Sequence, residues 1–318
     1  MGTIYEAFDQ YLRSELTLPL RPQEAGQRVS LEVTFGTAAA VDESDFHWFN
    51  EWKAEDGAIS IAAARKDGAY LIRFPGLADF TIDAGLAVVQ VFPVAARDEG
   101  VLAHLLVDQL LPRLLNQRGR LVVHASSVAL PDGRVIAFLG ATGQGKSTLA
   151  AALMQYGCAL VTDDCLLLDC RQDHVLALPA YHSLRLWPDS LAALFRGGSG
   201  FLPISPTMEK CQWIPPATSD KAEGVRLAAV FALSPPAGKA DPTQPRIEPL
   251  RGAEATMALV QSLFVLDIDS TAVVQGNVQQ AARLAACPLP MFRLVYPRSY
   301  ARLNEVFDLI LTVMATGG

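Results

Sequence analysis

Short apolar runs with partial alternation dominate the first 100 residues of the chain, and glycine, proline or aspartate separates one run from the next. Alternation with a period of two is typical of strands that bury one face. The pattern therefore predicts a β-rich region, with strands at Leu31–Phe35, Ala58–Ala64, Tyr70–Phe74, Phe80–Ile82 and Leu86–Phe92.

The spacing of apolar positions becomes helical after residue 100. Val101–Leu115 carries this pattern, and Pro112 is expected to bend or end the helix because proline lacks a backbone N–H group. Gly119 then leads into the next apolar run. We place a domain boundary near residue 118, which predicts a β-rich α+β domain over residues 1–118 and a second domain over residues 119–318.

Strand and helix patterns alternate in the second domain, and this alternation is typical of an α/β fold. Buried strands are predicted at Leu121–Val123, Val135–Leu139 and Cys158–Thr162, with a helix at Thr148–Tyr156 between the last two. Further along, the pattern predicts helices at Ala253–Val265 and Val278–Ala286, a strand at Met291–Val295 and a final helix at Tyr300–Met314.

The segment after the Val135–Leu139 strand reads Gly-x-x-x-x-Gly-Lys-Ser, the pattern of a phosphate-binding loop (P-loop). Its glycines allow backbone N–H groups to turn toward phosphate oxygens, and the helix N-terminus favours negative charge. Lys146 is expected to reach the β- and γ-phosphates, and the Ser147 hydroxyl to ligate Mg²⁺. The predicted ATP and Mg²⁺ site consists of Gly140, Ala141, Thr142, Gly143, Gln144, Gly145, Lys146, Ser147 and Thr148.

Two adjacent carboxylates, Asp163 and Asp164, follow the predicted strand Cys158–Thr162. Neighbouring negative charges repel each other unless a cation neutralises them. Mg²⁺ bound to ATP supplies such a cation, so the sequence favours a metal-linked site over a solvated acidic turn. This pair follows Lys146 after only one helix, much sooner than the acidic residue of a typical P-loop protein.

His124, the Gly140–Ser147 loop and Leu160-Val-Thr-Asp-Asp164 together resemble the catalytic domain of HPr kinase/phosphorylase. The resemblance is closer to the HPr-kinase-related proteins of bacterial peptide-modifying gene clusters. It covers about residues 120–235 and is strongest over residues 124–168. It implies a P-loop fold of the HPr kinase/phosphoenolpyruvate carboxykinase type and a serine kinase that acts on a protein or peptide.

The resemblance also implies roles for single residues. Asp164 would be the general base on the acceptor hydroxyl, and Asp163 would lie beside it near the metal. His124 would line the site, and Arg226 is the best match for the family's late catalytic arginine. The family usually has Glu after its P-loop where this chain has Thr148, and its segment with a second metal-binding Glu is not evident. The resemblance therefore does not carry over the phosphorylase reaction or HPr as substrate.

Some polar residues outside these motifs are further candidates. His182, Arg185 and Trp187 alternate with apolar residues, so one side of that segment is a candidate wall for the nucleotide or the acceptor. Lys210 and Lys221 flank a proline-rich loop that is either a closing lid or a solvated linker. Asp267-Ile-Asp269 is expected to be a surface turn.

The net charge of −7 and pI of about 5.3 lack the basic footprint of a nucleic-acid-binding protein. The chain has no apolar run of 18 residues, so no membrane span is predicted. Its five cysteines form no Cys-x-x-Cys pair, and we expect them to be reduced and mostly buried, in the cytoplasm. The sequence leaves a homo-oligomer open.

The sequence thus predicts an ATP-dependent kinase that phosphorylates a serine-type hydroxyl of a peptide or small protein. Two other classes stay open, namely a P-loop NTPase switch and a nucleotide-sensing regulatory module without phosphotransfer. The aromatic cluster Phe46–Trp52 is either a packed mini-core or a surface on which the N-terminal domain docks the peptide.

Overall fold

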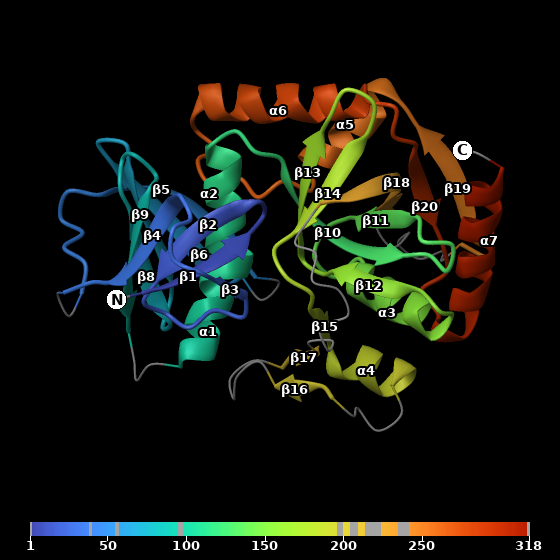
Figure 1. Ribbon diagram of the computed structural model, residues 1–318, viewed down its shortest axis with the longest axis horizontal. Helices are drawn as coiled ribbons and strands as arrows, with labels where there is room; N and C mark the ends of the chain where they lie inside the picture. The colour runs from blue at the N-terminus through green and yellow to red at the C-terminus, as the bar shows by residue number, and fades with distance from the viewer. Residues whose placement is uncertain are drawn as a thin grey trace. The chain divides into compact units, whose positions relative to one another are not determined.

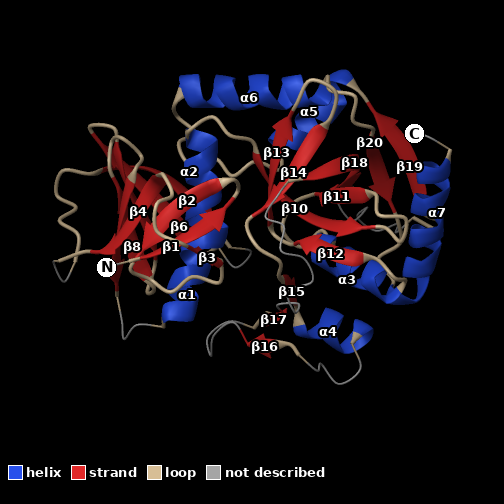
Figure 2. Cartoon of the chain, in the orientation of Figure 1, coloured by secondary structure: helices blue, strands red, loops and turns tan. Residues whose placement is uncertain are grey.

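The computed structural model describes residues 2–37, 40–54, 57–94, 98–195, 200–203, 209–213, 224–234 and 242–316. They form a mixed α/β structure with large sheets (Figure 2), which confirms that part of the predicted fold class. The chain divides into two compact units. One contains Met1–Arg118 and Val265–Val274, and the other contains Gly119–Phe264 and Gln275–Gly318.

The first unit is built on one mixed sheet with the strand order β3-β1-β2-β4-β9-β8-β7-β6-β5. Strand β4 runs parallel to both of its neighbours, β2 and β9, and the other pairings are antiparallel. The strands are β1 (Thr3–Ala7), β2 (Gln10–Ser14), β3 (Arg21–Gln23), β4 (Val29–Phe35), β5 (His47–Lys53), β6 (Ile59–Lys66), β7 (Ala69–Phe74), β8 (Ala78–Ile82) and β9 (Val88–Pro93).

The Phe46–Trp52 aromatic cluster lies mostly in β5, at one edge of this sheet. An arginine lies over each of three rings: Arg73 over Trp48 at 4.9 Å, Arg65 over Phe49 at 5.1 Å and Arg113 over Trp52 at 5.3 Å. Such cation–π contacts stabilise aromatic side chains that remain partly in water. Trp48 is 37% exposed, so the cluster is an arginine-capped surface feature as well as a packing feature.

A continuous helical segment follows the sheet in the first unit. It consists of α1 (Glu99–His104), a π-helical stretch (Leu105–Leu110) and α2 (Leu111–Gln117). Pro112 does not end the helix. It lies in the first turn of α2, directly after the π-helical stretch, and proline is tolerated in the first turn of a helix although it lacks an N–H group. The Gln117 amide donates a hydrogen bond of 2.8 Å to the Tyr70 hydroxyl on β7, which ties the segment to the sheet.

Val265–Val274 belongs to the first unit although it follows most of the second unit in sequence. Asp267 holds this segment in place: its carboxylate accepts hydrogen bonds from Arg65 and Tyr70, each at 3.1 Å to Oδ2. It also accepts from the backbone N–H groups of Asp269 and Ser270. The expectation of a surface turn is wrong for Asp267, which is 2% exposed, because these donors compensate for its burial.

The second unit contains an eight-stranded sheet with the strand order β11-β10-β13-β14-β18-β20-β19, in which β12 also pairs with β10. Strand β18 also pairs in parallel with β11, so β11, β10, β13, β14 and β18 form a closed circuit. The strands are β10 (Val122–Ala129), β11 (Val135–Leu139), β12 (Ala159–Thr162), β13 (Cys165–Cys170), β14 (Val175–Pro179), β18 (Val225–Leu233), β19 (Arg246–Leu250) and β20 (Met291–Val295).

Strand β11 is apolar throughout because both of its faces are covered. Val135, Ala137 and Leu139 join a core cluster that includes residues of α5 (Gly252–Val260) and α6 (Thr271–Ala285). The alternate residues, Ile136 and Phe138, join a second cluster with residues of α3 (Lys146–Gln155) and α7 (Leu303–Ala315). Figure 1 shows α3 and α7 on one side of these strands and α5 on the other. A strand buried on both faces reads as a continuous apolar run.

A small antiparallel sheet and a short helix complete the described part of the second unit. The sheet has the order β15 (Leu184–Leu186), β17 (Cys211–Trp213) and β16 (Leu202–Pro203). Helix α4 (Pro188–Leu194) begins directly after β15. Residues of this layer pack against Ala151 and Met154 of α3. The Ser190 hydroxyl on α4 also lies 3.0 Å from that of Thr148, in the first turn of α3.

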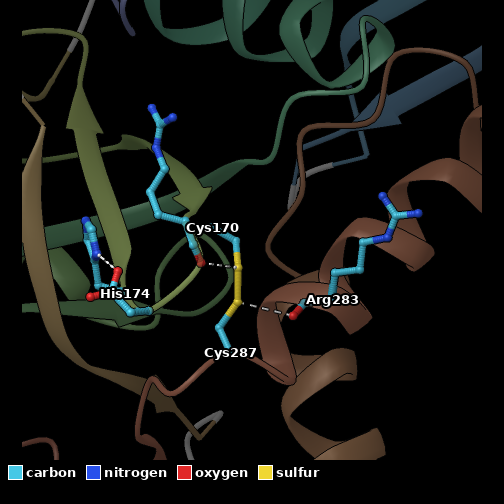
Figure 3. Close-up of a disulfide and its surroundings, with 6 residues drawn as sticks. Cys170, His174, Arg283 and Cys287 are labelled. Atoms are coloured by element: carbon cyan, nitrogen blue, oxygen red, sulfur yellow. Dashed lines mark hydrogen bonds and ion pairs between the residues drawn. A yellow bond between two sulfur atoms is a disulfide. The ribbon is translucent and has the colours of Figure 1, made fainter.

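The structure overturns the expectation that all five cysteines are reduced, because Cys170 and Cys287 form a disulfide (Figure 3). The bond joins the end of β13 to the turn after α6, across 117 residues of sequence. Cys158, Cys165 and Cys211 do not take part in a disulfide. Disulfides are rare in the reducing cytosol, so the cysteines no longer support the cytoplasmic expectation. In the part of the chain that the structure describes, no helix is long and apolar enough to cross a membrane.

Candidate functional site

The Gly140–Gly145 loop connects the end of β11 to the start of α3. Gly143 and Gly145 adopt φ angles of +81° and +83°, a region that side chains other than glycine rarely enter. A Cβ on Gly145 would also lie 3.1 Å from Arg298 Nη1 and 3.2 Å from the Tyr296 hydroxyl. Glycine at this position therefore satisfies both the backbone turn and the close packing of Arg298 beneath the loop.

Lys146 is the first residue of α3 and is only 4% exposed. Its ammonium group donates hydrogen bonds to the carbonyl oxygens of Gly140, at 2.7 Å, and Ala141, at 3.1 Å. Burial lowers the pKa of Lys146 to about 8, although the nearby charges of Asp164 and Asp163 act in the opposite direction. The chain thus holds a cation against the inside of the glycine loop.

Asp163 follows β12 and lies beneath the first turn of α3. The Ser147 hydroxyl donates a hydrogen bond of 2.9 Å to its Oδ1, and Ser126 donates to the same oxygen. The backbone N–H of Arg185 donates to Oδ2 at 3.1 Å. Burial, reinforced by the charge of Asp164, raises the pKa of Asp163 to about 6. Burial and the charge of Asp164 therefore disfavour the ionised form of Asp163 more than its hydrogen bonds favour it.

Asp164 lies between β12 and β13 with φ of +71°, a conformation that costs a residue other than glycine free energy. Its Oδ2 forms an ion pair of 3.1 Å with Arg185 Nη1, and that arginine is itself buried over the ring of Tyr181. Burial alone would raise the pKa of Asp164, but the charges of Arg185, Lys210 and His124 outweigh it and hold the pKa below its usual value.

The two neighbouring carboxyl groups thus have pKa values displaced in opposite directions. Asp163 is surrounded by hydroxyl and amide donors, whereas Asp164 faces positive side chains. Opposite displacement of two adjacent carboxyl groups is typical of sites where they perform different tasks.

A cavity of about 610 Å³ opens at the glycine loop, entirely within the second unit. Its volume lies in the range of about 300–1,000 Å³ found for small-molecule sites. The loop and helix start contribute the residues Thr142 to Thr148, and the facing walls consist of His124, Asp164, Arg185, Leu186, Trp187, Asp189, Ser190, Lys210, Tyr296, Arg298, Ser299, Tyr300 and Leu303.

Most of the site residues predicted from the sequence meet at this cavity. His124, Asp164 and the loop residues from Thr142 onward line it, Gly140 and Ala141 bind the lysine, and Asp163 contacts Ser147 from behind. The His124 ring meets Phe264 edge to face, with centroids 5.5 Å apart.

The prediction that Arg226 belongs to this site is wrong, because Arg226 does not line the cavity. In the parallel pairing of β18 with β11, Leu227 lies opposite Val135 at the start of β11, whereas the glycine loop follows Leu139 at its other end. Arg226 instead lines a separate cavity with Arg134 and His174. The expected role of the late arginine therefore has no support at this position.

Of the further candidates, Arg185 and Trp187 line the cavity, and so does Lys210, whose ammonium group lies 5.3 Å from the centre of the Trp187 ring. His182 does not line it, and its Nδ1 lies 2.5 Å from the carbonyl oxygen of Val161. Lys221 lies outside the described residues.

Arg298 is a site residue that the sequence analysis missed. Its guanidinium donates hydrogen bonds of 2.6 Å to the carbonyl oxygens of Gln144 and Ser234, and lies 4.2 Å from the centre of the Tyr296 ring. The signal was available in part: β11, β18 and β20 run parallel, so the polar segments that follow them meet at one edge of the sheet. Arg298 follows β20 and braces the loop that follows β11.

No group of three or more His, Cys, Asp or Glu side chains among the described residues is arranged to hold a metal ion. Mg²⁺, however, commonly binds through one or two protein oxygens together with substrate phosphates. The Ser147 hydroxyl and the Asp163 carboxylate are two such hard oxygen donors, already in contact at 2.9 Å. The raised pKa of Asp163 indicates a place where a cation would relieve buried negative charge. The residues present therefore fit Mg²⁺ bound jointly with a phosphate.

Comparison with known proteins shows a weak structural likeness. No family model matches the sequence, and no curated protein matches it. Among solved structures, the chain is similar to the HPr(Ser) kinase/phosphatase from Coxiella burnetii, with 14% sequence identity and a TM-score of 0.32. The similarity covers 61% of this chain and 97% of the other.

Proposed function

We propose that this protein is an ATP-dependent kinase that transfers the γ-phosphoryl group to a serine-type hydroxyl of a peptide or small protein. The observation that carries this proposal is that a buried lysine, Lys146, and the carboxylate of Asp164 line one cavity, with the carboxylate of Asp163 in contact with the cavity residue Ser147. The pKa values of the two carboxyl groups are displaced in opposite directions. A cation for phosphate and two differently tuned carboxylates are the parts that phosphoryl transfer to a hydroxyl requires.

The donor's phosphates would lie against the Gly140–Gly145 loop. The Lys146 ammonium group donates hydrogen bonds to two loop carbonyls. With the donor bound, it would also donate to the β- and γ-phosphate oxygens. Ser147 and Asp163 would hold Mg²⁺, which when bound would neutralise charge on the phosphates. Arg298 would keep the loop in its phosphate-binding shape through the carbonyl of Gln144.

The acceptor hydroxyl would donate a hydrogen bond to Asp164, whose ion pair with Arg185 keeps it ionised and oriented. As the acceptor oxygen forms its bond to the γ-phosphorus, the bond from that phosphorus to the β–γ bridging oxygen breaks, and its electron pair leaves with ADP. The acceptor proton passes to Asp164. The low pKa of Asp164 makes it chiefly an orienting group that accepts the proton late, which suits a loose transition state.

The acceptor class rests on the resemblance of His124, the glycine loop and the Asp pair to HPr-kinase-related proteins. The cavity adds positive side chains, Arg185 and Lys210, on the side of Asp164. They would stabilise charge on the transferring phosphoryl group.

The test is an assay with γ-labelled ATP and Mg²⁺, in which the full-length chain is offered serine-containing peptides and the same peptides with alanine in place of serine. We expect label in the serine peptides only, and its loss in Asp164→Asn but not in Asp173→Asn, an exposed carboxylate at the β13–β14 turn. Free labelled phosphate without labelled peptide would indicate an NTPase switch, and neither product would indicate a nucleotide sensor. Either outcome would overturn the kinase proposal.

A further inference from the structure

The candidate cavity has a second end whose chemistry the phosphate site does not use. Thr148, the residue after Ser147, lies with its hydroxyl 3.0 Å from that of Ser190, at the start of α4. The Ser190 hydroxyl lies 3.1 Å from the Tyr300 hydroxyl, and Tyr300 donates a hydrogen bond of 3.2 Å to Asp189. These contacts join three distant parts of the chain into one wall, which we call the hydroxyl wall: Thr148, Asp189, Ser190 and Tyr300.

We propose that the hydroxyl wall is the nucleoside subsite of this cavity and that it selects ATP as phosphoryl donor over pyrophosphate or another inorganic polyphosphate. The inference deepens the proposed function and rests on it. It concerns the residues that bind the nucleoside of ATP, which the motifs around Lys146 do not determine because they recognise phosphate groups alone.

The direction of the donor follows from the order of groups along the loop and helix. The terminal phosphate belongs near Lys146, Ser147 and the Asp pair, where the cation and the carboxylates meet. The 5′ end of a nucleotide is at the opposite end of the triphosphate. It would leave the loop along the Thr148 side of the helix start, and the hydroxyl wall begins at Thr148.

The chemistry of the wall fits a nucleoside. A carboxylate can accept about four hydrogen bonds, so Asp189 has capacity for a ribose hydroxyl beyond its contact with Tyr300. Carboxylates bind ribose hydroxyls in this way in dinucleotide-binding proteins. The Tyr300 side chain is 40% exposed yet lines the cavity, so its ring offers a face on which a base can stack.

The position of the wall is well fixed, as a subsite requires. Ser190 is only 4% exposed and holds both Thr148 and Tyr300. Tyr300 begins the short 3₁₀ turn that leads into α7, which packs on the same core cluster as α3. The cavity of about 610 Å³ exceeds what phosphates alone would fill.

The experiment measures the dissociation constants of Mg²⁺ complexes of ATP, 2′-deoxy-ATP and inorganic tripolyphosphate by titration calorimetry, with the full-length chain. We expect wild type to bind ATP at least about tenfold more tightly than tripolyphosphate, because only ATP reaches the wall. Tyr300→Ala should remove most of that advantage and leave tripolyphosphate within about twofold of its wild-type value. Tyr300→Phe, which keeps the ring, should retain most of it.

Asp189→Asn should reduce the preference for ATP over deoxy-ATP, and Asp308→Asn on the exposed side of α7 is the matched control that should change neither ratio. Equal affinity of wild type for ATP and tripolyphosphate, with both weakened by Lys146→Ala, would overturn the nucleoside subsite and leave the phosphate site intact. Equal loss of both ligands in Tyr300→Ala would also overturn it. Binding of neither ligand by wild type would overturn the donor site of the proposed function as well.

Discussion

The Ser147 hydroxyl donates a hydrogen bond of 2.9 Å to Asp163, and this contact joins the start of α3 to the end of β12. The first residue belongs to the glycine-loop motif and the second to the carboxylate pair, so two signals that are separate in sequence form one oxygen-rich corner. It is the corner to which we assign Mg²⁺, and its neighbours Lys146 and Asp164 make the site testable one residue at a time.

Lys146→Ala should lower phosphotransfer by two or more orders of magnitude. It removes the cation that is buried against the carbonyls of Gly140 and Ala141, and loss of a preorganised electrostatic group of this kind costs about 3 kcal/mol in transition-state stabilisation. The glycine loop and its brace, Arg298, remain, so the thermal unfolding midpoint should change little. Near-normal transfer by a folded Lys146→Ala protein would refute the phosphate site.

Replacement of the two carboxylates should separate their roles. Asp163→Asn should raise the Mg²⁺ concentration needed for half-maximal activity, because an amide is a weaker ligand for a hard cation. Asp164→Asn should keep Mg²⁺·ATP binding but lose transfer, because an amide does not accept the proton. Calorimetry and Mg²⁺ titration of activity measure the two effects. Loss of nucleotide binding in Asp164→Asn, with a mild effect in Asp163→Asn, would exchange the assignments.

The raised pKa of Asp163 should be visible as a pH-dependent stability in buffer with a chelator. The folded chain raises this pKa from 3.8 to about 6, so the folded state binds the proton more tightly than the unfolded state. The stabilising contribution is complete below the unfolded pKa and is lost as the pH rises through 6. Relative to Asp163→Asn, the free energy of unfolding of wild type should fall by up to about 3 kcal/mol between pH 4 and 7.

Urea unfolding of both proteins across that pH range measures the difference. Asp164→Asn, which alters the neighbouring carboxylate whose pKa lies below its usual value, is the comparison that separates the two residues. A wild-type advantage that stays constant with pH would contradict the assignment of the raised pKa to Asp163.

Arg298→Lys should weaken Mg²⁺·ATP binding about tenfold, a change typical of losing hydrogen bonds from a charged donor. The guanidinium reaches the carbonyls of Gln144 and Ser234 at the same time, and an ammonium group lacks the fork that makes both contacts. Arg226→Lys is the matched control, since Arg226 lines a different cavity. Weaker binding in Arg226→Lys but not in Arg298→Lys would contradict the role of Arg298 and support the role predicted for Arg226.

Trp48→Ala in the full-length chain should raise the KM for the peptide about tenfold and leave the KM for ATP unchanged, if the arginine-capped cluster on β5 docks the acceptor. Trp48 is partly exposed at a sheet edge, with Arg73 over its ring. Leu77→Ala, another exposed apolar side chain of the first unit, is the control. Unchanged peptide kinetics in Trp48→Ala would leave the cluster with a packing role alone.

The elements around the loop were predictable because their signals are local. The run Val135–Leu139 is β11 in the structure, and the turn, helix and next strand follow within 30 residues. No strand was predicted for residues 46–52, because their polar and aromatic residues do not alternate strictly. They nevertheless form most of β5.

Contacts between distant residues were not predictable from spacing. The bond of Arg298 to Gln144 spans 154 residues and depends on three parallel strands ending at one edge. The Cys170–Cys287 disulfide spans 117 residues, so the cysteine pattern had no local signature to reveal it. Arg226 was misplaced for a similar reason: it lies near the start of β18, and only the parallel pairing of β18 with β11 shows that this end is the one away from the glycine loop.

The anchoring of Val265–Val274 in the first unit has a consequence during synthesis of the chain. Asp267, which binds Arg65 and Tyr70, leaves the ribosome about 150 residues after Arg118. At translation rates of about 5–20 residues per second, Asp267 is synthesised roughly 7–30 s after the N-terminal sheet is complete. Arg65 and Tyr70 remain without this partner for that time, while most of the second unit emerges. Completion of the N-terminal unit is therefore a late event in the biogenesis of this protein.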